Sequence, residues 1–210
     1  MASKSKRKTK FIWTKEMIIL LVCLFAAIVA AILLNLPTSK ERSLTKYNEA
    51  IETYNSNNST SYTTLTKDNV YKDISHDSLV SKKASSDYTY VLYGSFEDGT
   101  FLDELYKVNV AAKNYDIDLV YLCDSAWYED EDDKDTVEFR ALVKEKETAL
   151  NSSVDKDQKD FDVSLGTALM VFKDDKLIYN SQTYSSSESS SEYNWYLYVN
   201  KALTIGKETN

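Results

Sequence analysis

The chain has 210 residues, with 25 Lys and Arg against 33 Asp and Glu, and it contains two Cys, four Gly and one Pro. Two cysteines cannot build a disulfide framework or a four-cysteine zinc site, and so few Gly and Pro exclude collagen-like and Pro-rich disordered chains. The formal net charge of −8 lacks the basic footprint of a nucleic-acid-binding protein, so we expect no nucleic-acid partner.

The charge is divided unevenly along the chain. Residues 1–36 hold six basic residues and one acid, Glu16, which gives a net charge of +5. The remaining residues hold 19 basic and 32 acidic residues, a net charge of −13. This asymmetry indicates that the two parts face different environments.

Residues 17–34 form an uncharged apolar run. As a helix this run would span about 27 Å, close to the ~30 Å hydrocarbon core of a bilayer, so we predict a transmembrane helix over 17–36. The basic segment 1–16 precedes it, and positively charged flanks stay on the cytoplasmic side. We therefore expect a single-pass protein of the cell membrane, with a cytoplasmic N-terminus and an extracytoplasmic C-terminal domain. A cleaved signal peptide is the alternative, which the length of the run and the missing small-x-small cleavage pattern disfavour.

A polar segment follows at 37–75, rich in Ser, Thr, Asn and Lys, with its apolar residues mostly isolated. We predict an extracytoplasmic tether here, with room for one short helix at 44–54.

Periodic apolar patterns then predict a folded domain over 76–210. Residues 88–94 are β-branched and aromatic, which is typical of a buried strand. Apolar residues at helical spacing predict a helix over 101–112, and residues 117–123 form a second strand. Because one helix connects these strands, we expect them to be parallel neighbours.

The second half of this domain begins with an acidic stretch at 129–135, which leads into a predicted helix near 136–150. Apolar runs at 167–173 and 177–180 flank a short polar turn and predict a β-hairpin. A last helix is predicted at about 192–203. The expected order is β-α-β-α-β-β-α, an α/β fold.

That order, with a parallel βαβ unit followed by an antiparallel hairpin and a closing helix, resembles the thioredoxin fold. The segment YVLYGSFEDGTFLDELYKV is similar to the strand, active-site loop and helix of that family. IDLVYLCDS resembles the next strand, and GTALMVFKDDKLI resembles the hairpin. Within the family the chain looks most like the membrane-associated thioredoxin-like proteins of Gram-positive bacteria, including the bacteriocin-transport accessory type.

The departures from the family pattern bear on function. The resemblance would place the two redox cysteines near Ser95 and Asp98 and the cis-proline at about Gly166, and all three are missing. Thiol–disulfide exchange needs a thiolate and a resolving thiol, so the resemblance implies a non-redox binding or accessory module with an extracytoplasmic protein partner and no cofactor. The candidate binding face is the degenerate active site: Ser95, Phe96, Glu97, Asp98, Gly166 and Thr167.

Ser95 followed by acids at 97 and 98 is interpreted as a helix N-cap rather than a catalytic serine, because the one His, His76, lies near the tether. Cys123 ends an apolar strand and is expected to be a small buried residue. Its alternative role is that of a reactive thiol, which would make the chain a monothiol redox or mixed-disulfide protein. A third possibility is a surface spacer without enzymatic activity.

Metal binding and exposed aromatic side chains are the remaining expectations. The acidic runs from Asp130 and from Asp155 fail the EF-hand template, which needs Gly at its sixth position, so we predict no metal site. Phe96, Trp127 and Tyr128 are the aromatic residues that we expect to find exposed.

Overall fold

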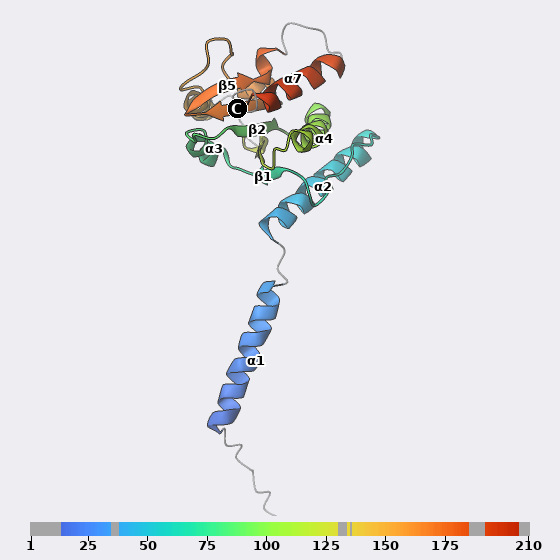
Figure 1. Cartoon of the computed structure of the whole chain (residues 1–210), viewed down its shortest axis with the longest axis vertical. Helices are drawn as coiled ribbons and strands as arrows, with labels where there is room; N and C mark the ends of the chain where they lie inside the picture. Colours follow the sequence, from blue (N-terminus) through green and yellow to red (C-terminus); the bar gives the residue numbers. More distant parts are fainter. Residues whose placement is uncertain (1–13, 35–37, 130–133, 135, 185–191, 206–210) are drawn as a thin grey trace, which may run out of the picture. The chain divides into compact units, whose positions relative to one another are not determined.

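The structure, a computed structural model, describes residues 14–34, 38–129, 134, 136–184 and 192–205, and it describes no side chains for 30–34, 39, 129 and 192–196. The chain divides into two compact units, Met1–Ser39 and Lys40–Asn210. The first unit holds the helix α1 (Lys15–Leu34) (Figure 1). The apolar side chains of α1 that the structure describes are exposed. Within the described residues, no helix has both the length and the apolar character that a membrane crossing needs.

The second unit is a mixed α/β domain with one five-stranded sheet. The elements in chain order are α2 (Ser39–Asn58), β1 (Tyr71–Asp73), α3 (His76–Lys82), β2 (Thr89–Gly94), α4 (Gly99–Asn114), β3 (Val120–Asp124), α5 (Ala126–Glu129), α6 (Val137–Leu150), η1 (Val163–Leu165), β4 (Ala168–Lys173), β5 (Lys176–Asn180), η2 (Ser181–Thr183) and α7 (Glu192–Thr204).

The sheet has the strand order β1-β3-β2-β4-β5. β3 is parallel to both β1 and β2, whereas β4 is antiparallel to β2 and to β5. The predicted parallel pairing of the first two long strands and the predicted hairpin are therefore confirmed. The hairpin turn places Asp174 and Asp175 at φ values of 50° and 62°, the left-handed conformation that a tight two-residue turn requires.

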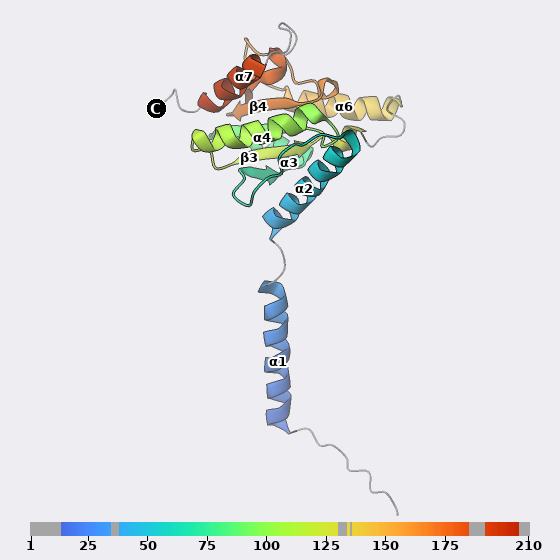
Figure 2. The ribbon, with the colours of Figure 1, turned by 90° about the vertical axis from the view of Figure 1, so that its right-hand side faces the viewer.

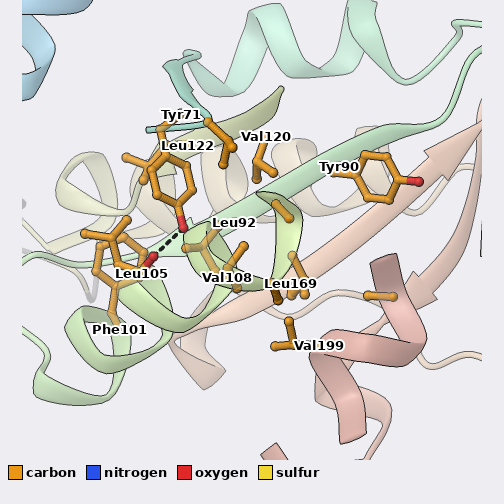
Figure 3. Packing of buried hydrophobic residues seen from close by; sticks show 14 of the residues in the cluster. Tyr71, Tyr90, Leu92, Phe101, Leu105, Val108, Val120, Leu122, Leu169 and Val199 are labelled. Atoms are coloured by element: carbon orange, nitrogen blue, oxygen red, sulfur yellow. Dashed lines mark hydrogen bonds between the residues drawn. The ribbon is translucent and has the colours of Figure 1, made fainter. Parts of the chain in front are cut away.

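Each face of the sheet carries its own apolar core. Along β2 the buried side chains alternate, so that Leu92 joins the core beneath α2, α4 and α7, while Val91 and Tyr93 join the core beneath α3 and α6. Figures 1 and 2 show α4 and α7, which contact each other, next to one another. In the first core the hydroxyl of Tyr71 donates to the carbonyl of Leu105, which ties β1 to α4 (Figure 3).

The predicted tether over 37–75 is wrong for most of its length, and the compact domain begins near residue 40 rather than at 76. α2 is a long helix, and its Tyr47 and Ile51 are each only 1% exposed because they pack into the first core. β1 then adds an edge strand to the sheet beside β3. Burial of an apolar stripe against the sheet stabilises this helix despite its polar composition.

Candidate functional site

The candidate face lies at one edge of the sheet, where β1, β3 and β2 end and β4 begins. In parallel α/β sheets this carboxyl edge is the usual place for ligands, because the loops that follow the strands converge there. Here the loop after β2 supplies residues 95–98, and the chain before β4 supplies Gly166 and Thr167.

Asp98 holds the two parts of this face together. Its carboxylate accepts a hydrogen bond from the backbone N–H of Thr100 at 2.8 Å and so caps the N-terminus of α4. The hydroxyl of Thr167 donates to the other carboxylate oxygen of Asp98 at 3.3 Å. The structure therefore brings Asp98 and Thr167 together, as the candidate face requires.

Ser95 is buried and is not the helix cap that the sequence predicted. Its hydroxyl accepts a hydrogen bond from the backbone N–H of Glu97 at 3.0 Å, and the true N-cap is Asp98, three residues further along the chain. Because the chain makes a turn at residues 95–98 before α4 begins, the cap lies three residues later than expected. This places a carboxylate, rather than a hydroxyl, at the positive end of the helix.

Phe96 is also buried, with 8% of its surface exposed, so the expectation that it is exposed is wrong. Its ring stacks on Tyr47 of α2, with centroids 5.2 Å apart, and meets Phe101 of α4 edge-on at the same centroid distance. Tyr47 belongs to the segment predicted as a tether, so the residue that buries Phe96 could not be expected from the sequence.

α2 is anchored across this edge by polar contacts as well as by the stacked rings. The hydroxyls of Ser43 and Tyr47 both donate to the carboxylate of Asp73, at the end of β1. Burial, and then the neighbouring Asp73, raise the pKa of Tyr47 far above its usual value, so it stays a hydrogen-bond donor. Lys46 pairs with Asp124, at the end of β3, at 3.1 Å.

A groove remains open between the C-terminal half of α2 and the loop after β2. Its volume is about 530 Å³, and its lining includes Thr53, Tyr54, Asn57, Asn58, Phe96 and Glu97. Of the predicted face, Glu97 is exposed, and Asp98, Gly166 and Thr167 are half-buried. The face therefore keeps an open surface although Ser95 and Phe96 turn inward.

Leu165, next to this face, is an exposed apolar residue that the sequence reasoning missed. Its side chain is 61% exposed, at the end of the short helix η1. Gly166 follows with a φ of 75°, a left-handed conformation that glycine adopts without strain, and a Cβ there would meet no atom within 4 Å. Polar and apolar residues alternate over 160–165, and Leu165 occupies an apolar position of this pattern. The sequence therefore predicts that Leu165 is buried and carries no signal for its exposure.

Cys123 belongs to the second core, on the side of the sheet that α3 and α6 cover. It is 1% exposed and has no disulfide partner. Burial, and then the carboxylate of Asp124, raise the pKa of its thiol to about 12, and Lys146 opposes this only in part. At neutral pH the side chain is therefore an un-ionised, buried thiol.

His76 opens α3 and is buried, with 5% of its surface exposed, rather than lying in a tether. Its ring meets Trp127 edge-on at 5.3 Å, and neither the ring nitrogens of His76 nor the indole nitrogen of Trp127 has a hydrogen-bond partner among the described residues. Burial, and then the positive charge of Lys146, lower the pKa of His76 to about 4, against the opposing effect of Asp77. Trp127 and Tyr128 are half-buried, so the expectation that they are exposed is wrong.

Within the described residues, metal-binding side chains do not gather at the candidate face. Over the described part of the chain, no group of three or more His, Cys, Asp or Glu side chains could hold a metal ion, and most of the acidic stretch 129–135 lies outside that part. Searches against protein-family models, curated protein sequences and solved structures find no match. Function must therefore be inferred from the geometry of the face itself.

Proposed function

We propose that the chain is a membrane-anchored, extracytoplasmic domain of the thioredoxin-like type that lacks redox chemistry and binds a protein partner at the carboxyl edge of its sheet. The sheet order supports this fold assignment, because a parallel β1-β3-β2 half is continued by an antiparallel hairpin and a closing helix. Neither the fold type nor the partner follows from the comparisons, so each has to be tested directly.

The observation that carries the non-redox proposal is the carboxylate of Asp98 at the N-terminus of α4. A helix N-terminus favours negative charge and would stabilise a catalytic thiolate placed there. In this chain the carboxylate uses the free backbone N–H of Thr100 and would disfavour any neighbouring thiolate. The only described thiol of the domain, Cys123, is buried with its pKa raised, which disfavours the monothiol alternative.

Membrane anchoring is proposed from the sequence and from the first unit. Residues 17–34 carry no charge, the segment before them is basic, and the described apolar side chains of α1 are exposed. A single helix with a basic cytoplasmic flank would leave the acidic domain outside the cell membrane. Protease added to intact spheroplasts should then digest the domain, and full protection of the domain would contradict this topology.

The binding role is tested by photo-cross-linking in intact cells. A benzoylphenylalanine at Leu165 reports on the candidate face, and the same group at Val137, which is 77% exposed on α6, is the matched control. We expect a discrete protein adduct from position 165 that position 137 does not give. A spacer protein would give none from either position, and reduction of insulin disulfides by the purified protein would contradict the non-redox proposal.

A further inference from the structure

His76 is a buried titratable group that the candidate face does not use. Its ring is nearly fully buried and lies against Trp127 of the one-turn helix α5. Within the described residues, neither ring nitrogen of His76 has a hydrogen-bond partner, and the indole nitrogen of Trp127 has none either. A neutral imidazole is tolerated here, whereas an imidazolium would bring a positive charge and a second N–H donor into a place where its nitrogens have no described acceptor.

The groups packed around His76 oppose a second positive charge. Lys146 of α6 is largely buried, and its ammonium group lies 5.3 Å from the centre of the Trp127 ring. Asp77 of α3 is exposed and pairs with this ammonium group at 3.0 Å. β3 contributes the buried, un-ionised thiol of Cys123 to the same core. Protonation of His76 is therefore opposed first by burial and then by Lys146, and Asp77 favours it by less.

The helix α5 connects this histidine to the candidate face. It begins directly after β3, and the backbone N–H of Ala126 donates to the carboxylate of Asp124 at 3.1 Å. The other oxygen of this carboxylate pairs with Lys46 of α2 at 3.1 Å. The backbone N–H of Ser125 donates at 3.0 Å to the carbonyl of Gly94, the residue at which β2 ends and the candidate face begins. The start of α5 is therefore tied to α2 and to the loop after β2.

The position of α5 depends on contacts between aromatic rings. A helix of four residues is too short to be stable by itself, so packing has to hold it. The ring of Trp127 meets His76 edge-on at 5.3 Å, and the ring of Tyr128 lies 5.7 Å from that of Phe139 on α6. Loss of the contact with His76 removes one of these two supports. Short elements with few buried contacts open before the rest of a domain does.

We propose that protonation of His76 releases α5 and thereby weakens partner binding at the candidate face. The inference rests on the proposed binding function and names its regulation. The imidazolium leaves its place against Trp127 and becomes solvated, and α5 moves away with the indole ring. The hydrogen bonds that tie the start of α5 to β2 and β3 then break, so the loop after β2 loses an anchor and the face loses the shape that binds the partner.

The pKa of His76 determines the pH range and the size of the effect. Burial, and then Lys146, lower this pKa to about 4 in the closed form, and in the open form the ring titrates near the ordinary value of 6.5. The open form binds more protons between these two values, so a falling pH shifts the equilibrium toward it. At pH 4.5 the shift toward the open form is about 80-fold relative to neutral pH.

Acrylamide quenching of Trp127 fluorescence measures the opening. The substitutions Trp13→Phe and Trp195→Phe leave Trp127 as the single tryptophan of the full-length protein, which is studied in detergent. We expect the Stern–Volmer constant to rise about twofold or more from pH 7.5 to pH 4.5, and to stay nearly constant after the further change His76→Phe. Carboxylates titrate in both proteins, so their effects cancel in the comparison.

Two results of this measurement would overturn the switch. An equal rise with and without His76, or no rise in either protein, would show that the histidine does not control α5. Loss of the far-ultraviolet circular dichroism over the same pH range would show that the whole domain unfolds instead of opening locally.

Two substitutions on α6 test the role of the neighbouring charge. Lys146→Met removes the positive charge that opposes protonation of His76, so it should reduce the rise in the Stern–Volmer constant. Lys144→Met, at an exposed lysine of the same helix, should leave the rise unchanged. Circular dichroism verifies that each variant is folded. Equal effects of the two substitutions would contradict the assignment of Lys146 as the opposing charge.

Photo-cross-linking from position 165 in isolated cell envelopes tests the coupling to the face. We expect the adduct yield to fall by about half or more from pH 7.5 to pH 4.5, and to persist in the His76→Phe variant. An equal fall in both proteins, or a constant yield while Trp127 opens, would show that α5 does not control the face and would leave the binding function standing. If no adduct forms at pH 7.5, the binding function fails, and its regulation fails with it.

Discussion

The single histidine provides a direct test of the packing on the α3 and α6 side of the sheet. His76 is nearly fully buried against Trp127. Two charged groups act on the pKa of its ring: Lys146 of α6 lowers it, and Asp77 of its own helix raises it. Replacing His76 by Phe keeps an aromatic ring against Trp127 and removes the titrating group.

The expected size of the effect follows from the pKa of His76. In the unfolded chain the imidazole titrates near 6.5, and in the folded protein burial and Lys146 lower its pKa to about 4. Between these two values the unfolded state binds more protons, so stability is fully present above pH 6.5 and falls as the pH decreases toward 4. Since each pKa unit corresponds to about 1.4 kcal/mol, the loss amounts to about 3 kcal/mol.

Urea unfolding of the full-length protein and of His76→Phe, between pH 7.5 and 4.5, measures this loss. Circular dichroism and tryptophan fluorescence follow the transition. Carboxylates titrate in both proteins, so their contribution cancels in the difference between the two free energies of unfolding. That difference should grow by about 2 to 3 kcal/mol in favour of the variant as the pH falls. If the two proteins lose stability in parallel, His76 is not buried in a neutral form and the reasoning is refuted.

Three further predictions test other parts of the structure. Ile51→Ala should lower the free energy of unfolding by about 3 kcal/mol because it truncates a fully buried side chain. Glu52→Ala on the same helix should change it by less than about 0.5 kcal/mol. Equal effects of the two substitutions in urea titration would mean that α2 does not pack on the sheet. In a Cys23→Ser background, Cys123, whose pKa is raised to about 12, should react with iodoacetamide at pH 7.5 only after denaturation, and rapid native labelling would favour the monothiol alternative. Gly94→Ala should cost about 2 kcal/mol, measured as a lower Tm, because its Cβ would stand 2.3 Å from the Phe101 ring, and an unchanged Tm would place that ring elsewhere.

The long strands and helices after residue 76 could be predicted because their apolar residues follow one clear period. β2, for example, is buried along its whole length and begins within one residue of its predicted start. The helix α2 also carried a signal, since Leu44, Tyr47, Ile51 and Tyr54 recur at the spacing of one helical face. Its Ser- and Asn-rich composition favours a tether with room for only a short helix at 44–54, whereas the helix runs from Ser39 to Asn58. β1, with three residues, is too short for any period to be recognised.

The candidate face was predicted less completely, because it depends on contacts between distant parts of the chain. The proximity of Asp98 and Thr167 was implied by the resemblance to the thioredoxin fold, which assigned both residues to one degenerate active site, and the structure joins them by a hydrogen bond. The burial of Phe96 depends on Tyr47, and the burial of His76 depends on Trp127, which lies on a different element. Patterns of period and composition contain no information about such pairs, so the exposure of single side chains at a site has to come from the structure.

The groove and the turned-in loop have a common origin in α2. Tyr47 draws Phe96 toward the core, which leaves Glu97 as the exposed residue of the loop after β2. The C-terminal half of the same helix, with Thr53 and Asn57, forms the facing wall. Without α2 the loop at residues 95–98 would border no groove. The segment whose composition suggests a passive tether is therefore the segment that builds one wall of the groove beside the candidate face, and substitutions on its exposed side should affect binding at that face before they affect folding.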